Sequence, residues 1–196
     1  MIRRAAFLLL LFFATIPAFS QGSSTDLRAI QLYAFGGVTG VYTGLDQGKN
    51  LGITAGVDLG YGMHYGLLPQ IEVRGTFPMD KGQVVGEKSF MGGLRVEKPY
   101  GRYHPYGDFL FGRGQLSYQG PGFLNPDGTV LYQRTNSNVW SPGGGIDIDV
   151  TRSIAFKADF QYQHFDTPVT VSGSIYSKAI TVGAVYRFGY RQNHPY

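Results

Sequence analysis

Residues 153–165, SIAFKADFQYQHF, alternate between apolar and polar side chains at every second position. The apolar set is Ile154, Phe156, Ala158, Phe160 and Tyr162, and the set between them is Ala155, Lys157, Asp159, Gln161 and Gln163. A period of two that lasts for about five cycles predicts a β-strand with one apolar and one polar face. Such a strand suits a closed barrel that turns its apolar face to lipid and its polar face to its own lumen.

Similar alternation recurs along the chain and predicts about eight strands in all. The expected strands are residues 28–38, 51–61, 67–77, 87–98, 103–118, 138–150, 153–165 and 176–188. The facing of the first strand is open, because residues 32–35 are all apolar. In the fifth strand Leu110 and Leu116 share the face of Asp108, which weakens the alternation there.

The expected connections alternate between long and short. The long ones are residues 39–50, 78–86, 119–137 and 166–175, and the short ones are residues 62–66, 99–102 and 151–152. Long loops at one end and short turns at the other are typical of outer-membrane barrels, whose short turns face the periplasm. An even number of strands places both termini in the periplasm as well.

Composition supports a β-rich single domain. The 196 residues include 29 Gly, 14 Tyr and 14 Phe but no Cys, so neither a disulfide nor a thiol-ligated metal site can form. The net charge of +4 includes Arg3 and Arg4, and removal of residues 1–20 would leave +2. That balance, without any basic run, argues against a nucleic-acid partner.

The first twenty residues resemble a signal peptide. Arg3 and Arg4 precede an apolar core, and residues 18–20 end in small side chains, so we expect cleavage before Gln21. The apolar run is too short for a membrane-spanning helix, which needs about 20 residues. We therefore expect a signal peptide at residues 1–20, a barrel at 21–188 and a short periplasmic tail at 189–196.

Ionisable side chains of both signs gather on the polar faces of neighbouring strands. They are Asp58, Glu72, Arg74, Arg95, Glu97, Asp108, Asp147, Asp149, Lys157, Asp159 and Arg187. A barrel of about eight strands is just filled by its own side chains, so charges enclosed there must be paired and hydrogen-bonded. A structural network in the lumen is favoured over a proton or small-ion path, because so narrow a barrel has little room for continuous water.

Aromatic residues fall at the two ends of the apolar faces. Phe77, Phe90, Trp140, Tyr162 and Tyr176 lie at the loop end, and Tyr61, Tyr186 and Phe188 lie at the turn end. The outward positions between them are mostly Ile, Val, Leu, Ala and Gly. This distribution predicts two aromatic girdles at the level of the lipid headgroups.

The C-terminal part resembles a known family. The Gly-rich run of residues 141–150, the aromatic strand that follows it and the closing run of residues 182–188 are similar to OmpA-like outer-membrane β-barrel domains. The resemblance implies an all-β fold, an eight-stranded antiparallel up-and-down transmembrane β-barrel, in the outer membrane of a Gram-negative bacterium. It also implies folding by the barrel assembly machinery, with the last strand and Phe188 as its signal. Residues 189–196 depart from the pattern, so they form a periplasmic extension or Tyr196 shares the signal.

No catalytic, metal or cofactor site is predicted. His64, His104, His164 and His194 are scattered, and we expect ordinary interface histidines. Barrel enzymes that deacylate lipid A need a Ser beside an outward His, and His164 has no Ser two residues away, so only a cross-strand partner could complete such a site.

The sequence therefore predicts a non-enzymatic, monomeric membrane barrel that contacts outer-membrane lipid and lipopolysaccharide. Loop 119–137 is the expected contact with an external partner, because it is longest and carries Phe123, Leu131 and Tyr132, which should be exposed. Three alternatives stay open: a narrow channel, a lipid A-modifying enzyme and a soluble lipocalin-like ligand binder with its charges in water.

Overall fold

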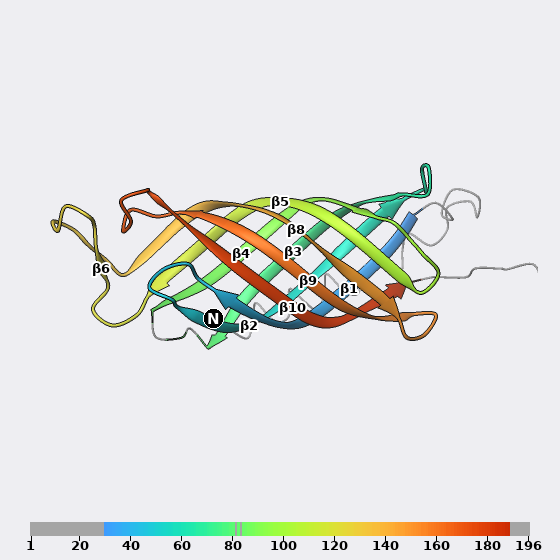
Figure 1. Ribbon diagram of the computed structural model, residues 1–196, viewed down its shortest axis with the longest axis horizontal. Coiled ribbons are helices and arrows are strands. Elements are labelled where there is room, and N and C mark those ends of the chain that lie inside the picture. Colours follow the sequence, from blue (N-terminus) through green and yellow to red (C-terminus); the bar gives the residue numbers. More distant parts are fainter. Residues whose placement is uncertain (1–29, 81, 83, 189–196) are drawn as a thin grey trace, which may run out of the picture. The chain divides into compact units, whose positions relative to one another are not determined.

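The computed structural model describes residues 30–80, 82 and 84–188, so the expected signal peptide and C-terminal tail lie outside the described residues. The strands are β1 (Ile30–Tyr42), β2 (Lys49–Tyr61), β3 (Leu68–Asp80), β4 (Val85–Glu97), β5 (Tyr103–Tyr118), β6 (Phe123–Leu124), β7 (Leu131–Tyr132), β8 (Arg134–Asp149), β9 (Ile154–Asp166) and β10 (Ser174–Phe188) (Figure 1). In this part of the chain no helix is long and apolar enough to cross a membrane.

The long strands form one closed antiparallel barrel in the order β1-β10-β9-β8-β5-β4-β3-β2. Each long strand pairs with the long strand that follows it in the sequence. The first and last strands, β1 and β10, pair from Leu32↔Phe188 to Tyr42↔Lys178, which closes the barrel. Closure leaves no strand edge unpaired, as a sheet in lipid requires. The predicted eight-stranded up-and-down barrel is confirmed. The short strands β6 and β7 form a separate hairpin inside the connection between β5 and β8.

The barrel turns its aliphatic side chains outward and its charges inward. Ile154 and Ile180 are 45% and 49% exposed, whereas Lys157 and Asp159 are 1% and 3% exposed. An outward belt of aliphatic residues suits a hydrocarbon environment, so the soluble lipocalin-like alternative, which needs the reverse arrangement, is wrong.

The exposure of the side chains also shows which way the residues of β1 and β5 face, which the sequence left open. In β1, Tyr33 and Phe35 are buried in the lumen and Leu32 is exposed. In β5, Leu110 is buried with Asp108, while Phe109 is exposed. The apolar side chains that blurred the pattern are therefore lumen residues.

Several strands extend further toward the loop end than predicted. β3 and β4 reach Asp80 and Val85, so the expected loop at residues 78–86 shrinks to residues 81–84. β1 continues to Tyr42, and the loop expected at 39–50 shrinks to 43–48. These segments lack clear apolar alternation, but their backbone groups complete the ladder with the neighbouring strand, which in lipid is obligatory.

The Gly-rich part of β8 has a packing role. A Cβ atom added at Gly143 would lie 2.1 Å from Nε2 of Gln161, and one at Gly145 would lie 2.6 Å from the hydroxyl oxygen of Tyr106. Both positions pair with β9. The missing side chains thus make room inside the barrel for Gln161 and Tyr106.

Candidate functional site

The lumen of the barrel is the best-defined polar site, and Arg95 lies at the centre of one half of it. Its guanidinium donates to Asp58 at 3.0 Å, to Asp147 at 2.6 Å and to Glu97 at 2.9 Å. These partners come from β2, β8 and β4 itself, and all are buried. One cation therefore links three strands across the lumen.

Arg74 organises the neighbouring group. It donates to Asp159 at 2.7 Å and to Glu72, and lies 3.7 Å from Asp108. Gln161 also donates to Asp108, at 2.9 Å. Charge-assisted hydrogen bonds of this kind are the strong ones, and here they connect β3 with β5 and β9.

Lys157 lies between these two groups and rests against aromatic rings. Its Nζ is 4.3 Å from the Tyr106 ring centroid, 4.6 Å from that of Phe35 and 3.6 Å from Asp147. The Tyr106 hydroxyl donates to Asp159 at 2.8 Å. Cation–π contacts stabilise the desolvated ammonium of Lys157 in addition to its ion pair with Asp147.

A third group closes the lumen at the turn end. Arg187 pairs with Asp149 at 2.7 Å, and His104 contacts Glu97 at 2.8 Å and Asp149 at 3.1 Å. His104 is therefore a lumen residue, and its expected place at the membrane interface is wrong. It has the same facing as Asp108 in β5, and this parity could have identified it.

The structure thus brings together all the side chains that the sequence grouped on the polar faces. They lie inside the barrel as Asp58, Glu72, Arg74, Arg95, Glu97, Asp108, Asp147, Asp149, Lys157, Asp159 and Arg187, of which Asp149 is the most exposed. The carboxylates outnumber the Lys and Arg cations, and Arg74 and Arg95 each pair with three of them. The loss of one Arg would leave several buried carboxylates without their partner.

Above the charges, toward the loop end, a ladder of threonines crosses four strands. The hydroxyl of Thr39 lies 2.9 Å from that of Thr181 and 2.6 Å from that of Thr54, which lies 2.8 Å from that of Thr76. All four are buried. The sequence reasoning looked for charge and missed these neutral groups, although they share the inward parity of their strands.

The loop half of the lumen contains a cluster of apolar side chains, which we call the apolar plug. Its buried members are Val85, Met91, Leu110, Leu116, Tyr118, Val139, Phe165 and Ile175. Phe123 and Tyr132, from the hairpin strands, pack against it and are only partly exposed. Their expected exposure is therefore wrong, because they cover the plug, whereas Leu131 is 49% exposed as expected.

Glu87 is a buried carboxyl in the loop half. It accepts a hydrogen bond from Ser177 at 2.6 Å and is 3% exposed. Among the described residues no Lys or Arg lies within ion-pairing distance of Glu87. It shares the inward parity of Arg95 and Glu97 in β4, a signal that the sequence analysis did not use.

The aromatic residues assigned to the girdles lie on the outer surface. Tyr61, Phe77, Phe90, Tyr176, Tyr186 and Phe188 are exposed, and Trp140 and Tyr162 are partly exposed. Ring centroids of Tyr186 and Phe188 are 4.8 Å apart at the turn end, and those of Tyr162 and Tyr176 are 5.5 Å apart at the loop end. The rings therefore contact one another, within β10 at the turn end and between β9 and β10 at the loop end.

His164, the candidate for an outward catalytic histidine, is packed between aromatic rings. Its ring centroid lies 4.9 Å from that of Trp140, nearly parallel, and 4.9 Å from that of Tyr176, edge to face. Trp140 and Tyr176 are also its cross-strand partners in β8 and β10. The two positions directly opposite His164 are thus taken by aromatic residues. Within the described chain no three His, Asp or Glu side chains are placed to hold a metal ion.

Comparison with known proteins identifies the type of barrel. Residues 6–188 match the family model of the outer membrane protein beta-barrel domain. A search of curated protein sequences gives no match. Among solved structures, Neisserial surface protein A is 15% identical, with a TM-score of 0.51 over 81% of this chain and 97% of that one. The attachment invasion locus protein Ail of Yersinia pestis is 11% identical, with a TM-score of 0.46 over 81% of this chain and 97% of its own. At this identity the likeness to the neisserial protein is one of fold.

Proposed function

The chain belongs to the outer membrane protein β-barrel domain family, and on that premise we propose a non-enzymatic barrel with a closed lumen that presents its loops at the cell surface. The protein is located in the bacterial outer membrane. In such barrels the long loops face outward, and the two longest connections here, residues 119–133 and 167–173, lie at the same end as those at 43–48 and 81–84. We therefore orient this end toward the outside.

The observation that carries this proposal is the filling of the lumen from end to end. The turn half holds the ion-paired network, and the loop half holds the apolar plug, where Met91, Leu116 and Phe165 are 0% exposed. A conducting pore needs a continuous file of water, and this interior offers side chains instead. The filled lumen supports a structural role for the interior and leaves function to the loops.

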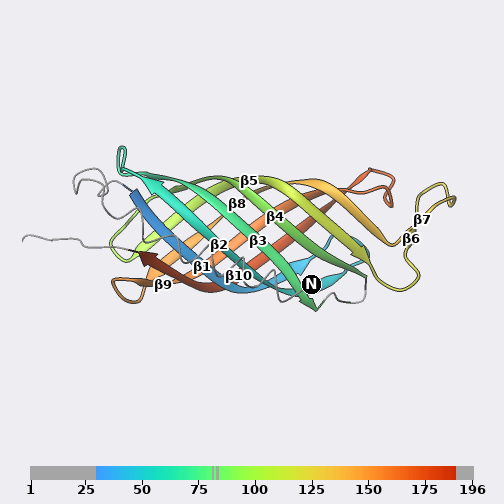
Figure 2. The same ribbon diagram turned by 180° about the vertical axis from the view of Figure 1, so that it is seen from behind.

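The hairpin β6–β7 is the most prominent feature of the loop end. In both views it projects beyond the ends of the barrel strands (Figures 1 and 2). Its bases, Phe123 and Tyr132, pack against the plug, while Leu124, Val130 and Leu131 are exposed. An anchored hairpin with exposed apolar side chains on its strands supports contact with an external partner, since exposed loops on a rigid scaffold carry most binding surfaces.

We assign two further partners to the same proposal. The barrel assembly machinery would recognise β10, which ends at the outward-facing Phe188. Lipid would contact the outward belt, and a monomer suffices because the barrel closes on itself.

Conductance across planar lipid bilayers tests the proposal. The purified full chain, shown to be folded by its heat-modifiable mobility on a denaturing gel, should give no steps of conductance. Stepwise conductance of the wild type would overturn the proposal in favour of a narrow channel. Altered lipid A on overexpression, lost in His164→Ala, would overturn it in favour of the enzyme.

A further inference from the structure

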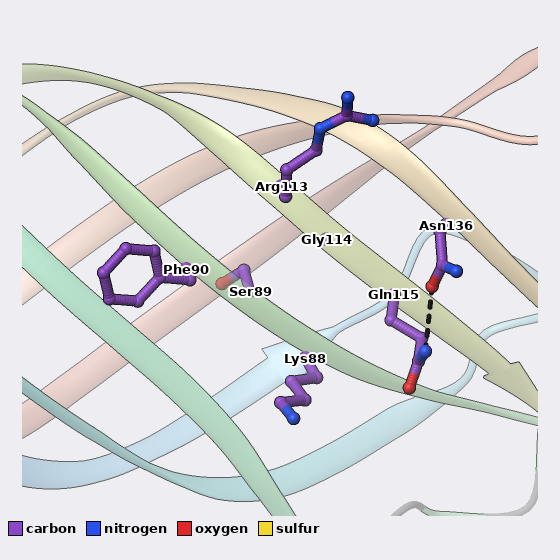
Figure 3. Close-up of a pocket in the computed structure, with 7 residues that line it drawn as sticks. All are labelled: Lys88, Ser89, Phe90, Arg113, Gly114, Gln115 and Asn136. Carbon is purple, nitrogen blue, oxygen red and sulfur yellow. Dashed lines mark hydrogen bonds between the residues drawn. The ribbon is translucent and has the colours of Figure 1, made fainter.

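Two crevices open on the outer surface of the barrel near its loop end, and each is lined by two cationic side chains. The first crevice, about 320 Å³, lies over β4, β5 and β8 and is lined by Lys88, Ser89, Phe90, Arg113, Gly114, Gln115 and Asn136 (Figure 3). No carboxylate belongs to this lining. These residues take no part in the lumen network.

The sheet register places the two cations of the first crevice on the same outer face, where their side chains extend in opposite directions from the two strands (Figure 3). Lys88 pairs with Gln115, and Phe90 pairs with Arg113, so Lys88 and Arg113 are diagonal neighbours on the outer face. An anion in the crevice would be attracted by both cations, one on each side of it.

Neutral donors complete the lining. Gln115 donates to Asn136 at 2.8 Å across the β5–β8 ladder, beside the two cations (Figure 3). An ammonium, a guanidinium and two amides together form the kind of donor set that binds the oxygens of a phosphate group.

The height of the crevice on the barrel points to lipid. Phe90 belongs to the loop-end girdle and is 62% exposed, and Lys88 lies over the Phe77 ring at 5.1 Å. Lys88 is two residues beyond Phe90 toward the loops on the same face, roughly 7 Å further along the strand. The cations therefore stand at and just above the level where aromatic girdles meet the headgroups.

The second crevice, about 500 Å³, repeats this chemistry over β1, β2, β9 and β10. Its cations are Lys49 and Lys178, and its aromatic residues include Tyr42, Tyr162 and Tyr176. Lys178 pairs with Tyr42 in the closing ladder, and Lys49 lies 5.5 Å from the Tyr42 ring. Two cations beside aromatic residues of the girdle therefore occur at two separate places near the loop end of the barrel.

We propose that these crevices bind the phosphate groups of anionic lipid in the outer leaflet, with Lys88 and Arg113 as the principal ligands in the first and Lys49 and Lys178 in the second. The inference rests on the proposed orientation, in which the loop end faces outward. Basic pockets between transmembrane helices bind phosphorylated lipid headgroups in the same way.

Native mass spectrometry of the full chain, released from vesicles, tests this inference. The vesicles contain neutral phosphatidylcholine with either bisphosphorylated lipid A or the same lipid A without its phosphates. The wild type should retain the phosphorylated form in preference. The double variant Lys88→Gln/Arg113→Gln should retain it more weakly by about fivefold for each charge removed. Lys88→Arg should restore most of the loss of Lys88→Gln.

The control is Arg152→Gln, which removes the same charge from the exposed turn at the opposite end. It should bind as the wild type does. Equal retention of both lipid forms, an equal loss in Arg152→Gln, or no loss in the double variant would each overturn the inference. Full displacement of the lipid by millimolar inorganic phosphate would overturn it too, because the site would then select a free anion. The conductance test is independent of all these outcomes.

Discussion

The guanidinium carbon of Arg95 lies 3.6 Å from the centroid of the Tyr106 ring, while the nitrogens of the same group reach Asp58, Asp147 and Glu97. The ring covers one face of the cation, and the carboxylates occupy its edge. This geometry uses the planar guanidinium in both of its binding modes, stacking and directed hydrogen bonding, which an ammonium cannot do.

Replacement of Arg95 by Met should therefore destabilise the barrel severely. The substitution removes the cation that Asp58 pairs with and one of the partners of Asp147 and Glu97, and loss of one partner of a buried pair costs about 3–5 kcal/mol. Urea unfolding in lipid vesicles, followed by fluorescence, measures the change. Arg152→Met, in an exposed turn, should change the free energy of unfolding by less than about 0.5 kcal/mol. Equal values for the two variants would contradict a stabilising role of the network.

Gly145→Ala should weaken the barrel although it adds a single methyl group. The new Cβ would lie 2.2 Å from the carbonyl oxygen of Ala158 and 2.6 Å from the Tyr106 hydroxyl, so backbone and ring must shift. Overpacking of this kind costs about 1–3 kcal/mol. The matched control is Gly40→Ala, whose added Cβ would meet no described atom within 4 Å. The same unfolding assay should show the control near the wild type.

Phe165→Ala should leave a cavity in the apolar plug. Phe165 is 0% exposed, and removal of a buried Phe side chain costs about 3–5 kcal/mol. Phe160→Ala, on the lipid-facing side of the same strand, is the control and should cost less, because Phe160 is 45% exposed. A variant with an unchanged free energy of unfolding would show that the plug does not contribute to stability.

Glu87→Gln should be nearly neutral, in contrast to Glu72→Gln. Glu87 is bonded to the Ser177 hydroxyl, and a Gln amide can occupy the same place without a buried charge. Glu72 accepts from Arg74, so its replacement loses a charged hydrogen bond worth about 1.5–3 kcal/mol. If Glu87→Gln proved the costlier of the two, Glu87 would have a role that its contacts do not suggest.

Trp140, the single tryptophan of the chain, reports on the loop-end girdle. It stacks on His164 at the outer surface, so lipid can approach its ring. Fluorescence in vesicles should be quenched more strongly by lipids brominated close to the headgroup than by lipids brominated at the ends of their chains, because girdle residues lie at headgroup level. Stronger quenching at the chain ends would place Trp140 at the middle of the bilayer.

The division of side chains between the two faces of the barrel could be predicted from period-two alternation. Which face meets lipid could not be predicted from that period alone, since a soluble barrel would show the same alternation. Partners across the lumen could not, since Arg95 and Asp147 belong to strands that are not adjacent. The apolar plug also escaped, because Met91 and Phe165 share the parity of charged residues nearer the turns. In the sequence, an inward apolar side chain looks like a break in the alternation, because the position of the residue along the barrel axis is not known.

Most of the ion-paired residues of the lumen lie toward the turn end, and the apolar plug lies toward the loop end. A second buried apolar cluster, which includes Tyr33 and Phe35, lies among the charges. The uneven distribution of charge gives the barrel a polarity for insertion. After export the polypeptide reaches the bilayer from the inner side, and its leading end must pass through the acyl chains. That leading end carries Met91, Leu116, Val139 and Phe165, whose transfer into hydrocarbon is favourable. Most of the ionised side chains of the lumen follow behind and stay near the inner surface of the membrane. The groups that cost the most free energy to transfer into hydrocarbon therefore travel the shortest distance.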